Sequence, residues 1–307
     1  MKILVTGSNG LLGQKVTDAY LHQHAGEEVF ELIATGLGPN RHPVQIGYTY
    51  CQLDITNPIS LREKIIDLAP DCIIHTAAMT NVDACERDVE NCRNLNVNAV
   101  RYLAEICAER DIHLVHLSTD FIFDGYNPPY SETAEPNPLS VYGQSKLDAE
   151  LSILQSQCST SIIRTVLVYG CLAREPKSNF VLWAKKALEN NEQIRVVEDQ
   201  WRMPTLAEDL ASACITAAKR KAKGIFNIAG PKVYSIFELV QEVADFWQLS
   251  KDLIMPISTS TLNQAARRPM NTELILYKAH TELNFRPKSF REGLSVVDRQ
   301  LQDAALR

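Results

Sequence analysis

The sequence predicts an α/β fold, a Rossmann-type doubly wound parallel sheet with a smaller, interleaved C-terminal part. Short apolar runs alternate with helical patterns along the first half of the chain, which is typical of βαβ units. A glycine-rich turn joins the first apolar run to the first helical pattern. With 307 residues, 45% of them hydrophobic, the chain can bury a large core.

Composition argues against several classes of function. The net charge is −6 and basic residues form no block, which disfavours a nucleic-acid partner or an anionic membrane surface. No apolar run reaches the ~20 residues that span a bilayer, and the N-terminus lacks the features of a signal peptide. Eight cysteines are scattered without metal-ligand spacing, so we expect reduced thiols, no metal site and a cytoplasmic location.

The turn after the first predicted strand, 2–5, has the chemistry of a nucleotide site. Gly7, Gly10 and Gly13 give it a GxxGxxG spacing at the start of a helix. Glycines there permit a tight turn, a close approach of the backbone to a pyrophosphate and close packing of helix on strand. The helix N-terminus adds N–H groups and a partial positive charge. The turn therefore predicts a site for a dinucleotide, NADP or NAD.

The second strand, expected near 29–34, is followed by Gly36 and not by an acidic residue. An Asp or Glu there would bind the ribose 2′-hydroxyl of NAD, so its absence, with Arg41 in the next loop, favours NADP or dual use. Asp54 lies in the third strand, expected at 50–55. It either accepts a hydrogen bond from the adenine or stabilises a turn.

Small residues follow the fourth strand, which is expected at 72–75. Ala77 and Ala78 would let a cofactor lie against the strand ends, in the crevice where open α/β sheets bind ligands. We interpret His75 as a packed histidine at the end of this strand.

An amphipathic helix is expected at 89–110, and it carries two asparagines that bear on the site. We interpret Asn96 as a solvated position. For Asn98 a solvated position and a buried one remain equal alternatives, since a buried amide must find hydrogen-bond partners.

Three polar side chains are expected to meet at one edge of the sheet. The fifth strand, expected at 113–117, leads to Thr119, whose hydroxyl would point into the crevice. A helix that begins near Asn137 carries Tyr142 and Lys146 four residues apart, on one face and one turn separated. A buried ammonium beside a phenol lowers the pKa of the phenol toward working pH, which makes it usable as a general acid or base.

The pattern becomes less regular in the second half of the chain. In chain order we expect a sixth strand near 161–165, a helix and the strand 194–197 within 176–200, a helix and a strand that returns to the main sheet within 205–228, a helix near 235–247, and a last helix that opens with a capping box at Ser289–Glu292.

Several short motifs are spread along almost the whole chain. They are Thr6–Gly13, Leu53–Ile55, Ala77–Asp83, Val97–Ala99, Ser118–Gly125, Tyr142–Lys146, Pro204–Thr205, Asp209–Ala211 and Arg268–Asn271. In this order they resemble the extended short-chain dehydrogenases/reductases, and more narrowly the dTDP-4-dehydrorhamnose reductase group, to which the regulatory beta subunit of methionine adenosyltransferase also belongs. The resemblance implies an NAD(P)-binding domain at 1–170, joined by about 205–228, and a mainly substrate-binding domain at 171–307.

The resemblance also implies a reaction, the transfer of a hydride from reduced nicotinamide to the C4 ketone of a nucleotide-linked 4-keto-6-deoxy sugar. Tyr142 would protonate the ketone oxygen, Lys146 would lower the pKa of Tyr142 and bind the nicotinamide ribose, and Thr119 would orient the carbonyl. The expected cofactor contacts are Gly7, Asn9, Gly10, Leu11, Leu12, Gly13, Arg41, Asp54, Ile55, Ala77, Ala78, Thr80, Asn98, Tyr142 and Lys146. The expected substrate contacts are Thr80, Val82, Asp120, Phe121, Trp201 and, for the diphosphate, Arg268.

Two departures from the reductase pattern keep other functions open. Leu167 stands near the place where the family's sugar-contacting tryptophan is expected, and Gln200–Thr205 is closer to the regulatory beta subunit. A reductase is favoured because Thr119, Tyr142 and Lys146 are all present. The alternative is a non-catalytic, NADP-binding regulatory subunit or scaffold.

A third hypothesis is a nucleotide-sugar dehydratase or epimerase on the same scaffold. Phe121 stands where dehydratases of this type carry a glutamate, which counts against dehydration. The expected partners are a nucleotide sugar and, as an alternative to a monomer, a second copy of the chain in a homodimer.

Overall fold

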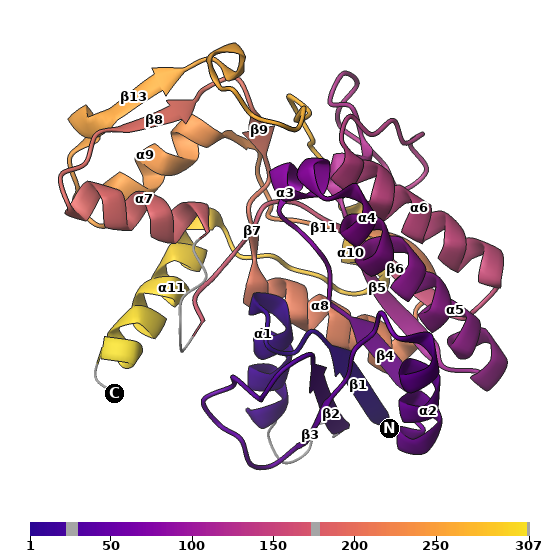
Figure 1. Cartoon of the computed structure of the whole chain (residues 1–307). Helices are drawn as coiled ribbons and strands as arrows, with labels where there is room; N and C mark the ends of the chain where they lie inside the picture. Colours follow the sequence, from indigo (N-terminus) through magenta and orange to yellow (C-terminus); the bar gives the residue numbers. More distant parts are fainter. Residues whose placement is uncertain (23–29, 173–178, 306–307) are drawn as a thin grey trace.

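The structure is a computed structural model of the chain, and it describes residues 1–22, 30–172 and 179–305. At its centre lies a seven-stranded sheet in the order β11-β6-β5-β4-β1-β2-β3, and neighbouring strands run parallel (Figure 1). The strand order reverses between β1 and β4, which is where open α/β sheets bind ligands. The predicted doubly wound parallel sheet is therefore confirmed. Its strands are β1 (Lys2–Thr6), β2 (Glu31–Gly36), β3 (Thr49–Gln52), β4 (Cys72–His75), β5 (His113–Thr119), β6 (Thr160–Thr165) and β11 (Gly224–Ile228).

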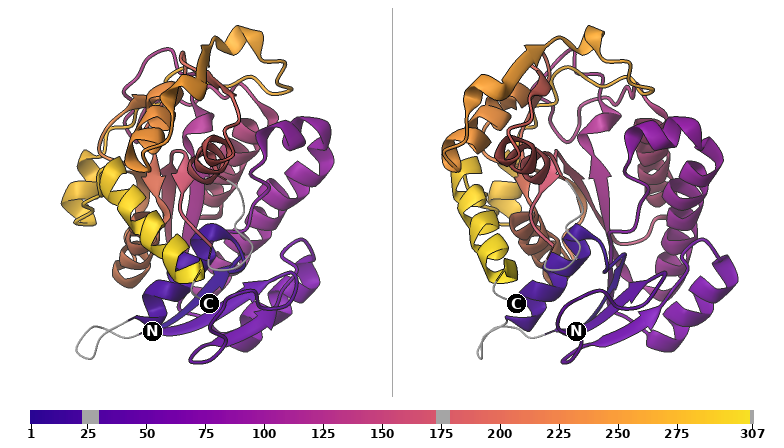
Figure 2. Two further views of the ribbon diagram at one scale, coloured as in Figure 1. Left: turned by 90° about the vertical axis from the view of Figure 1, so that its left-hand side faces the viewer. Right: turned by 60° about the vertical axis from the view of Figure 1, so that its left-hand side comes forward.

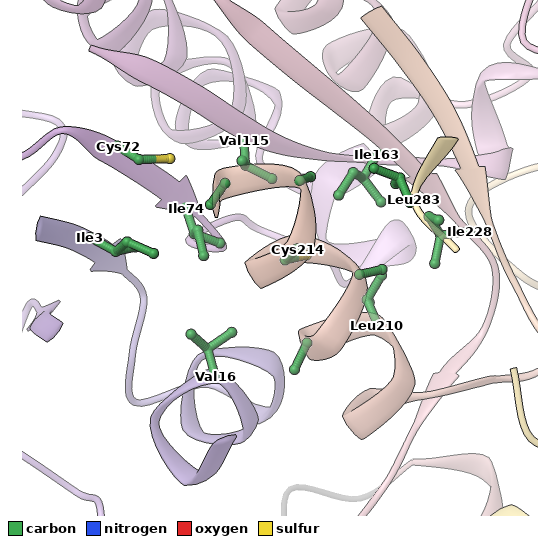
Figure 3. Packing of buried hydrophobic residues seen from close by; sticks show 14 of the residues in the cluster. Ile3, Val16, Cys72, Ile74, Val115, Ile163, Leu210, Cys214, Ile228 and Leu283 are labelled. Atoms are coloured by element: carbon green, nitrogen blue, oxygen red, sulfur yellow. The ribbon is translucent and has the colours of Figure 1, made fainter. Parts of the chain in front are cut away.

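Helices cover both faces of the sheet, because successive strand residues point to opposite faces and both sets are apolar. Ile3 enters the core under α1 and α8, which Figure 3 shows from close by, whereas Leu4 enters the core under the other helices. The helices are α1 (Leu11–Leu21) and α8 (Ala207–Arg220) on one face, and α2 (Pro58–Leu68), α5 (Ala99–Arg110) and α6 (Val141–Ser156) on the other.

The C-terminal part forms its own core beside the carboxyl ends of the strands (Figure 2). A parallel strand pair and three helices build it: β8 (Ile194–Val197), β13 (Ile254–Ile257), α7 (Phe180–Glu189), α9 (Ile236–Phe246) and α11 (Phe290–Ala305). Between α7 and α9 the chain returns to the main sheet, where β11 pairs with β6. The C-terminal part is therefore interleaved with the sheet, as predicted.

Short elements complete the described chain. They are α3 (Val82–Arg87), α4 (Val89–Arg93), a π-helical turn (Asn94–Asn98), 3-10 turns at Asp120–Ile122, Lys251–Leu253 and Thr259–Thr261, α10 (Tyr277–Glu282), and the strand pairs β7 (Val168–Tyr169) with β10 (Thr205–Leu206) and β9 (Trp201–Arg202) with β12 (Tyr234–Ser235).

Several predicted boundaries were wrong. The expected helix 89–110 is divided by the π-helical turn, a feature that is frequent at functional sites. Helix α6 begins at Val141 and not near Asn137, because the Ser140 hydroxyl accepts a hydrogen bond from the Gly143 N–H at 3.1 Å and caps the helix. Strand β5 continues to Thr119, which pairs with Thr165 of β6.

The second and third strands also differ from their predicted bounds. Strand β2 begins at Glu31, and Val29 lies outside the described residues. Strand β3 ends at Gln52, so Asp54 lies in the turn that follows.

The predicted start of the last helix was confirmed. Ser289 and Glu292 form the expected capping box, with the Ser289 N–H donating to Glu292 Oε2 at 2.8 Å and the Glu292 N–H donating to Ser289 Oγ at 3.3 Å. The eight cysteines are free thiols. Among the described residues no helix is long and apolar enough to cross a membrane.

A buried ion pair fixes α6 on the sheet. Arg164 of β6 donates two hydrogen bonds to Glu150 of α6, at 3.1 and 2.7 Å, and both side chains are at most 3% exposed. Arg164 also donates to the backbone oxygen of Glu132 at 3.0 Å. Because Tyr142 and Lys146 lie on α6, this pair sets where both residues sit relative to the sheet.

Arg164→Met should lower the free energy of unfolding by ~3–5 kcal/mol, because it leaves the Glu150 carboxylate buried without its partner. Urea denaturation followed by circular dichroism measures the effect. Arg62→Met is the control, since Arg62 pairs with Glu109 on the surface and its loss should barely move the midpoint. Equal midpoints for the two variants would contradict the stabilising role of the buried pair.

Candidate active site

Tyr142 lies in the first turn of α6, against the segment that follows β5. Helix and segment approach so closely that a Cβ on Gly143 would lie 2.2 Å from the Phe121 carbonyl oxygen. The Tyr142 ring packs edge-on against the Phe121 ring, with centroids 5.9 Å apart. Only a glycine after the tyrosine permits this contact, which brings the phenol to the end of the strand that carries Thr119.

The phenol of Tyr142 is protonated at neutral pH. Burial raises its pKa, a hydrogen bond with the Thr119 side chain opposes the rise, and the charge of Asp120 adds to it. The predicted lowering of the Tyr142 pKa was wrong, because desolvation of the phenolate dominates, and the Lys146 charge is not among the main influences on this group. A protonated phenol is nevertheless the form that a general acid needs.

Lys146 is buried one turn further along α6. Burial lowers the pKa of its ammonium to about 8, and the charge of Glu150 opposes this shift. Lys146 Nζ lies 3.3 Å from His116 Nε2. The pKa of the ammonium is therefore close to neutral pH, and the group lies against β5.

Asp120, expected to contact the substrate, uses both carboxylate oxygens inside the protein. Its Oδ1 accepts from the Thr119 hydroxyl at 3.0 Å, and its Oδ2 accepts from the Thr272 hydroxyl at 2.5 Å. Arg202 Nε lies 3.8 Å from Oδ2. Burial raises the pKa of Asp120, and Arg202 opposes the rise. The carboxylate thus connects the end of β5 to β9 and to the segment around Thr272.

The glycine turn fits a dinucleotide because side chains would fill its cradle. Gly7 has φ +70°, and a Cβ there would lie 2.7 Å from the Ala77 N. A Cβ on Gly13 would lie 2.5 Å from the Gly7 carbonyl oxygen. The turn and the start of α1, with Leu11 and Leu12, therefore pack closely on each other and on the segment of Ala77 and Ala78 after β4, at the switch point of the sheet, as a dinucleotide turn requires.

Side chains of Asn9 and Tyr50 crowd Gly36, the last residue of β2. A Cβ on Gly36 would lie 2.9 Å from Asn9 Nδ2 and 3.0 Å from the Tyr50 hydroxyl. Asn9 Oδ1 accepts from the Arg41 N–H at 2.8 Å, and Asn9 Nδ2 donates to the Tyr50 hydroxyl at 3.2 Å. Asn9 therefore holds exposed Arg41 beside the strand end, where the 2′ position of the adenine ribose binds in this fold.

Asn96 was misjudged from the sequence, since it is buried and not solvated. Its Oδ1 accepts from the Met79 N–H at 2.8 Å, and its Nδ2 donates to the Met79 oxygen at 3.0 Å and to Ser145 Oγ at 3.1 Å. It thereby joins the loop after β4 to the helix of Tyr142. Its spacing of four from the buried residues Cys92 and Val100 could have revealed it.

Asn98 is half-buried at the end of the π-helical turn. It lines a polar surface hollow of about 620 Å³, together with Asp88, Glu90, Asn91, Arg93 and Asn94.

Arg268 is paired within the protein. Its guanidinium donates to Asp83 Oδ2 at 2.7 Å and to Asp83 Oδ1 at 3.3 Å, and this contact lowers the pKa of Asp83. A diphosphate would have to compete with, or share, the contact to Asp83. Nearby, Thr80 is exposed and Val82 is half-buried at the start of α3.

The remaining predicted residues are two cofactor contacts, Asp54 and Ile55, and one substrate contact, Trp201. Asp54 is exposed and accepts from the Thr56 N–H at 2.9 Å, which is the turn role considered above, and Ile55 is buried in the core. Trp201 is exposed on β9, and its backbone N–H donates to the Met270 oxygen at 2.7 Å. Leu167, near the expected tryptophan position, is half-buried with φ +40°.

A model of the family described as RmlD substrate binding domain matches residues 1–302. The chain belongs to this family. Among curated RmlD-like relatives, dTDP-4-dehydrorhamnose reductase of Aggregatibacter actinomycetemcomitans is 30% identical over 308 residues, covering 96% of this chain and 98% of the relative. Methionine adenosyltransferase 2 subunit beta of Danio rerio is 30% identical over 279 residues, covering 89% of this chain and 82% of the relative.

Solved structures agree with the RmlD assignment. A dTDP-4-dehydrorhamnose reductase from Clostridium acetobutylicum superposes with a TM-score of 0.85 at 28% identity, covering 98% of this chain and all of the other. The reductase from Bacillus anthracis, solved in complex with NADP, gives 0.82 at 25% identity, covering 97% and 99% of the two chains. The predicted resemblance to the dTDP-4-dehydrorhamnose reductase group is confirmed.

NADPH should bind this RmlD-family chain more tightly than NADH. Arg41→Ala should raise the Kd for NADPH about ten- to a hundredfold and leave the Kd for NADH unchanged, because a charge-assisted contact to a phosphate contributes ~1.5–3 kcal/mol. Fluorescence titration of both cofactors measures this, with the surface variant Arg62→Ala as control. Tighter binding of NADH, or an equal loss for both cofactors, would show that Arg41 does not select the 2′-phosphate.

Proposed function

We propose that the chain is an NADPH- or NADH-dependent reductase of a nucleotide-linked 4-keto-6-deoxy sugar, similar to dTDP-4-dehydrorhamnose reductase. The observation that supports it is the hydrogen bond between protonated Tyr142 and Thr119 at the end of β5, with Lys146 Nζ 3.3 Å from His116 Nε2 on the same strand. The glycine cradle lies at the end of β1, two strands away in the same sheet. Acid and cofactor site thus face the same crevice, as ketone reduction requires.

The proposed mechanism divides the work between cofactor and protein. Reduced nicotinamide would supply the hydride to the ketone carbon. Tyr142 would transfer its phenolic proton to the ketone oxygen, so that an alcohol forms and a phenolate remains. The Thr119 hydroxyl, which donates to Asp120 Oδ1 here, would turn its proton to the same oxygen and so orient it. Because burial disfavours the phenolate, the Lys146 ammonium would have to stabilise it electrostatically until it regains a proton.

The sugar pocket would be closed from the C-terminal part. Arg202, a buried residue of β9, donates to the Pro269 oxygen at 2.7 Å and the Met270 oxygen at 3.3 Å, and its guanidinium lies over the Phe121 ring. These contacts would hold Trp201 and the segment with Arg268 over the end of β5. We further propose that Trp201 supplies the apolar sugar contact that Leu167 does not.

A non-catalytic regulatory role is the second candidate. Two observations favour it: Leu167 near the expected tryptophan position, and the pairing of Arg268 with Asp83, which would have to open or be shared for a diphosphate. In that case the chain would bind the cofactor and reduce no sugar. A homodimer stays a prediction under both hypotheses.

Tyr142→Phe should lower the turnover of a dTDP-4-keto-6-deoxy sugar by ~10²–10⁴-fold, because the general acid is lost while the ring remains. NADPH oxidation followed by absorbance measures turnover, and fluorescence titration should show cofactor binding close to wild type. Tyr102→Phe is the matched control on the neighbouring helix α5 and should keep full activity.

A turnover screen of the wild-type chain across 4-keto nucleotide sugars, with both cofactors, separates the two candidate functions. The reductase hypothesis expects NADPH or NADH consumption with at least one of them. Cofactor binding without turnover on any sugar would instead support the regulatory role.

A further inference from the structure

A row of polar side chains crosses the sheet beneath the proposed catalytic site and ends at Lys146. Thr6, His75 and His116 are paired in register on the adjacent strands β1, β4 and β5. Thr6 Oγ1 and His75 Nδ1 share a hydrogen bond of 2.7 Å, and the two imidazoles stack with centroids 5.5 Å apart and an angle of 16° between planes. Beyond them, His116 Nε2 lies 3.3 Å from Lys146 Nζ.

Among the described residues, His116 supplies the hydrogen-bond acceptor that contacts the Lys146 ammonium. The charged or titratable groups that act on Lys146 are Glu150 on its own helix, Cys92 on α4, and the two histidines on the strands. Glu150 is already bound by Arg164 through two hydrogen bonds. A buried ammonium has three N–H donors and needs acceptors, so the imidazole lone pair holds its position.

Both histidines are neutral. Burial is the largest cause that lowers their pKa values, to about 3 for His75 and well below its usual range for His116, and the Lys146 charge adds to both shifts. A neutral His116 can accept from Lys146 at Nε2 only if its proton is on Nδ1. The contact to Lys146 therefore fixes the tautomer of His116.

Packing alone does not account for this row. His116 Nδ1 and His75 Nε2 are buried without a hydrogen-bond partner in the described part of the chain. An unpaired buried polar atom is costly, and apolar side chains of similar size would fill the same space without that cost. The imidazoles are therefore better explained by the contact that one of them makes.

We propose that His116 is a positioning residue for Lys146, which holds the ammonium at the end of β5 by accepting its hydrogen bond, while His75 and Thr6 hold the imidazole in place. The role in catalysis rests on the proposed reductase function; the contact itself does not. Without this acceptor the ammonium should lose its proton at lower pH, because its charged form would be buried with one partner fewer. The His116 acceptor therefore sets the highest pH at which Lys146 stays charged.

The test is the titration of Lys146 in the chain without cofactor or substrate. Lysine labelled with ¹³C at Cε reports the pKa by NMR, and Lys146→Met assigns the signal. In the wild type the midpoint should lie near pH 8. His116→Phe should lower it by at least ~1 pH unit. His116→Gln, whose amide oxygen can replace Nε2 as acceptor, should restore most of the shift.

His113→Gln is the matched control, since His113 is a buried histidine on the same strand whose nitrogens bond to Ser159 and Ser161. It should leave the Lys146 midpoint at the wild-type value. An unchanged midpoint in His116→Phe would overturn the proposal. A shift of the Lys146 midpoint in His113→Gln as large as in His116→Phe would also overturn it. So would an equally large shift in His116→Gln, because either result would show that packing matters and the acceptor does not.

A measurement on the wild type keeps the proposal testable if His116→Phe does not fold. Long-range ¹H–¹⁵N spectra should show His116 as the Nδ1–H tautomer from pH 6 to 8, and an Nε2–H tautomer would overturn the proposal. If the chain reduces a sugar, the alkaline limb of kcat should move with the Lys146 midpoint in each variant. If it reduces none, the titration still decides the role of His116 independently of the proposed function.

Discussion

The proposed site depends on the burial of one ammonium group. Lys146 lies under the end of β5, and the loss of hydration brings the pKa of its ammonium to about 8. Burial of its own ring keeps Tyr142 protonated. A protonated acid, with a cation on the same helix face that can stabilise the anion left behind, is the combination that the proposed ketone reduction needs. Much of the surrounding structure can be understood as support for this combination.

Three groups of contacts give that support. The ion pair between Arg164 and Glu150 fixes α6 on β6 and also occupies the carboxylate one turn from Lys146 on the same helix. Asn96 connects the loop after β4 to Ser145 in the middle of the same helix. Asp120, through Thr272, connects the catalytic strand to the C-terminal part. Each contact joins segments that are far apart in the chain, so the site forms only when the whole fold does.

The family relationship is consistent with two activities. The residues proposed for acid catalysis and for the cofactor cradle are present, which a cofactor-binding regulator can also retain. The two activities would differ on the substrate side of the proposed site, where Leu167 has φ +40° and Arg268 is paired with Asp83. Substrate recognition, and not the hydride chemistry, is therefore the part of the function that turnover measurements must decide.

The sequence by itself determined the parallel sheet, the glycine cradle and the shared helix face of Tyr142 and Lys146. These features depend on local patterns: apolar runs of strand length, glycines at a fixed spacing and a separation of four residues. Only the tertiary structure decided that Asn96 is buried, that Asp120 is bound within the protein, that the pKa of Tyr142 is raised, and that His116 contacts Lys146. Burial and partners come from distant segments, and no local pattern carries them.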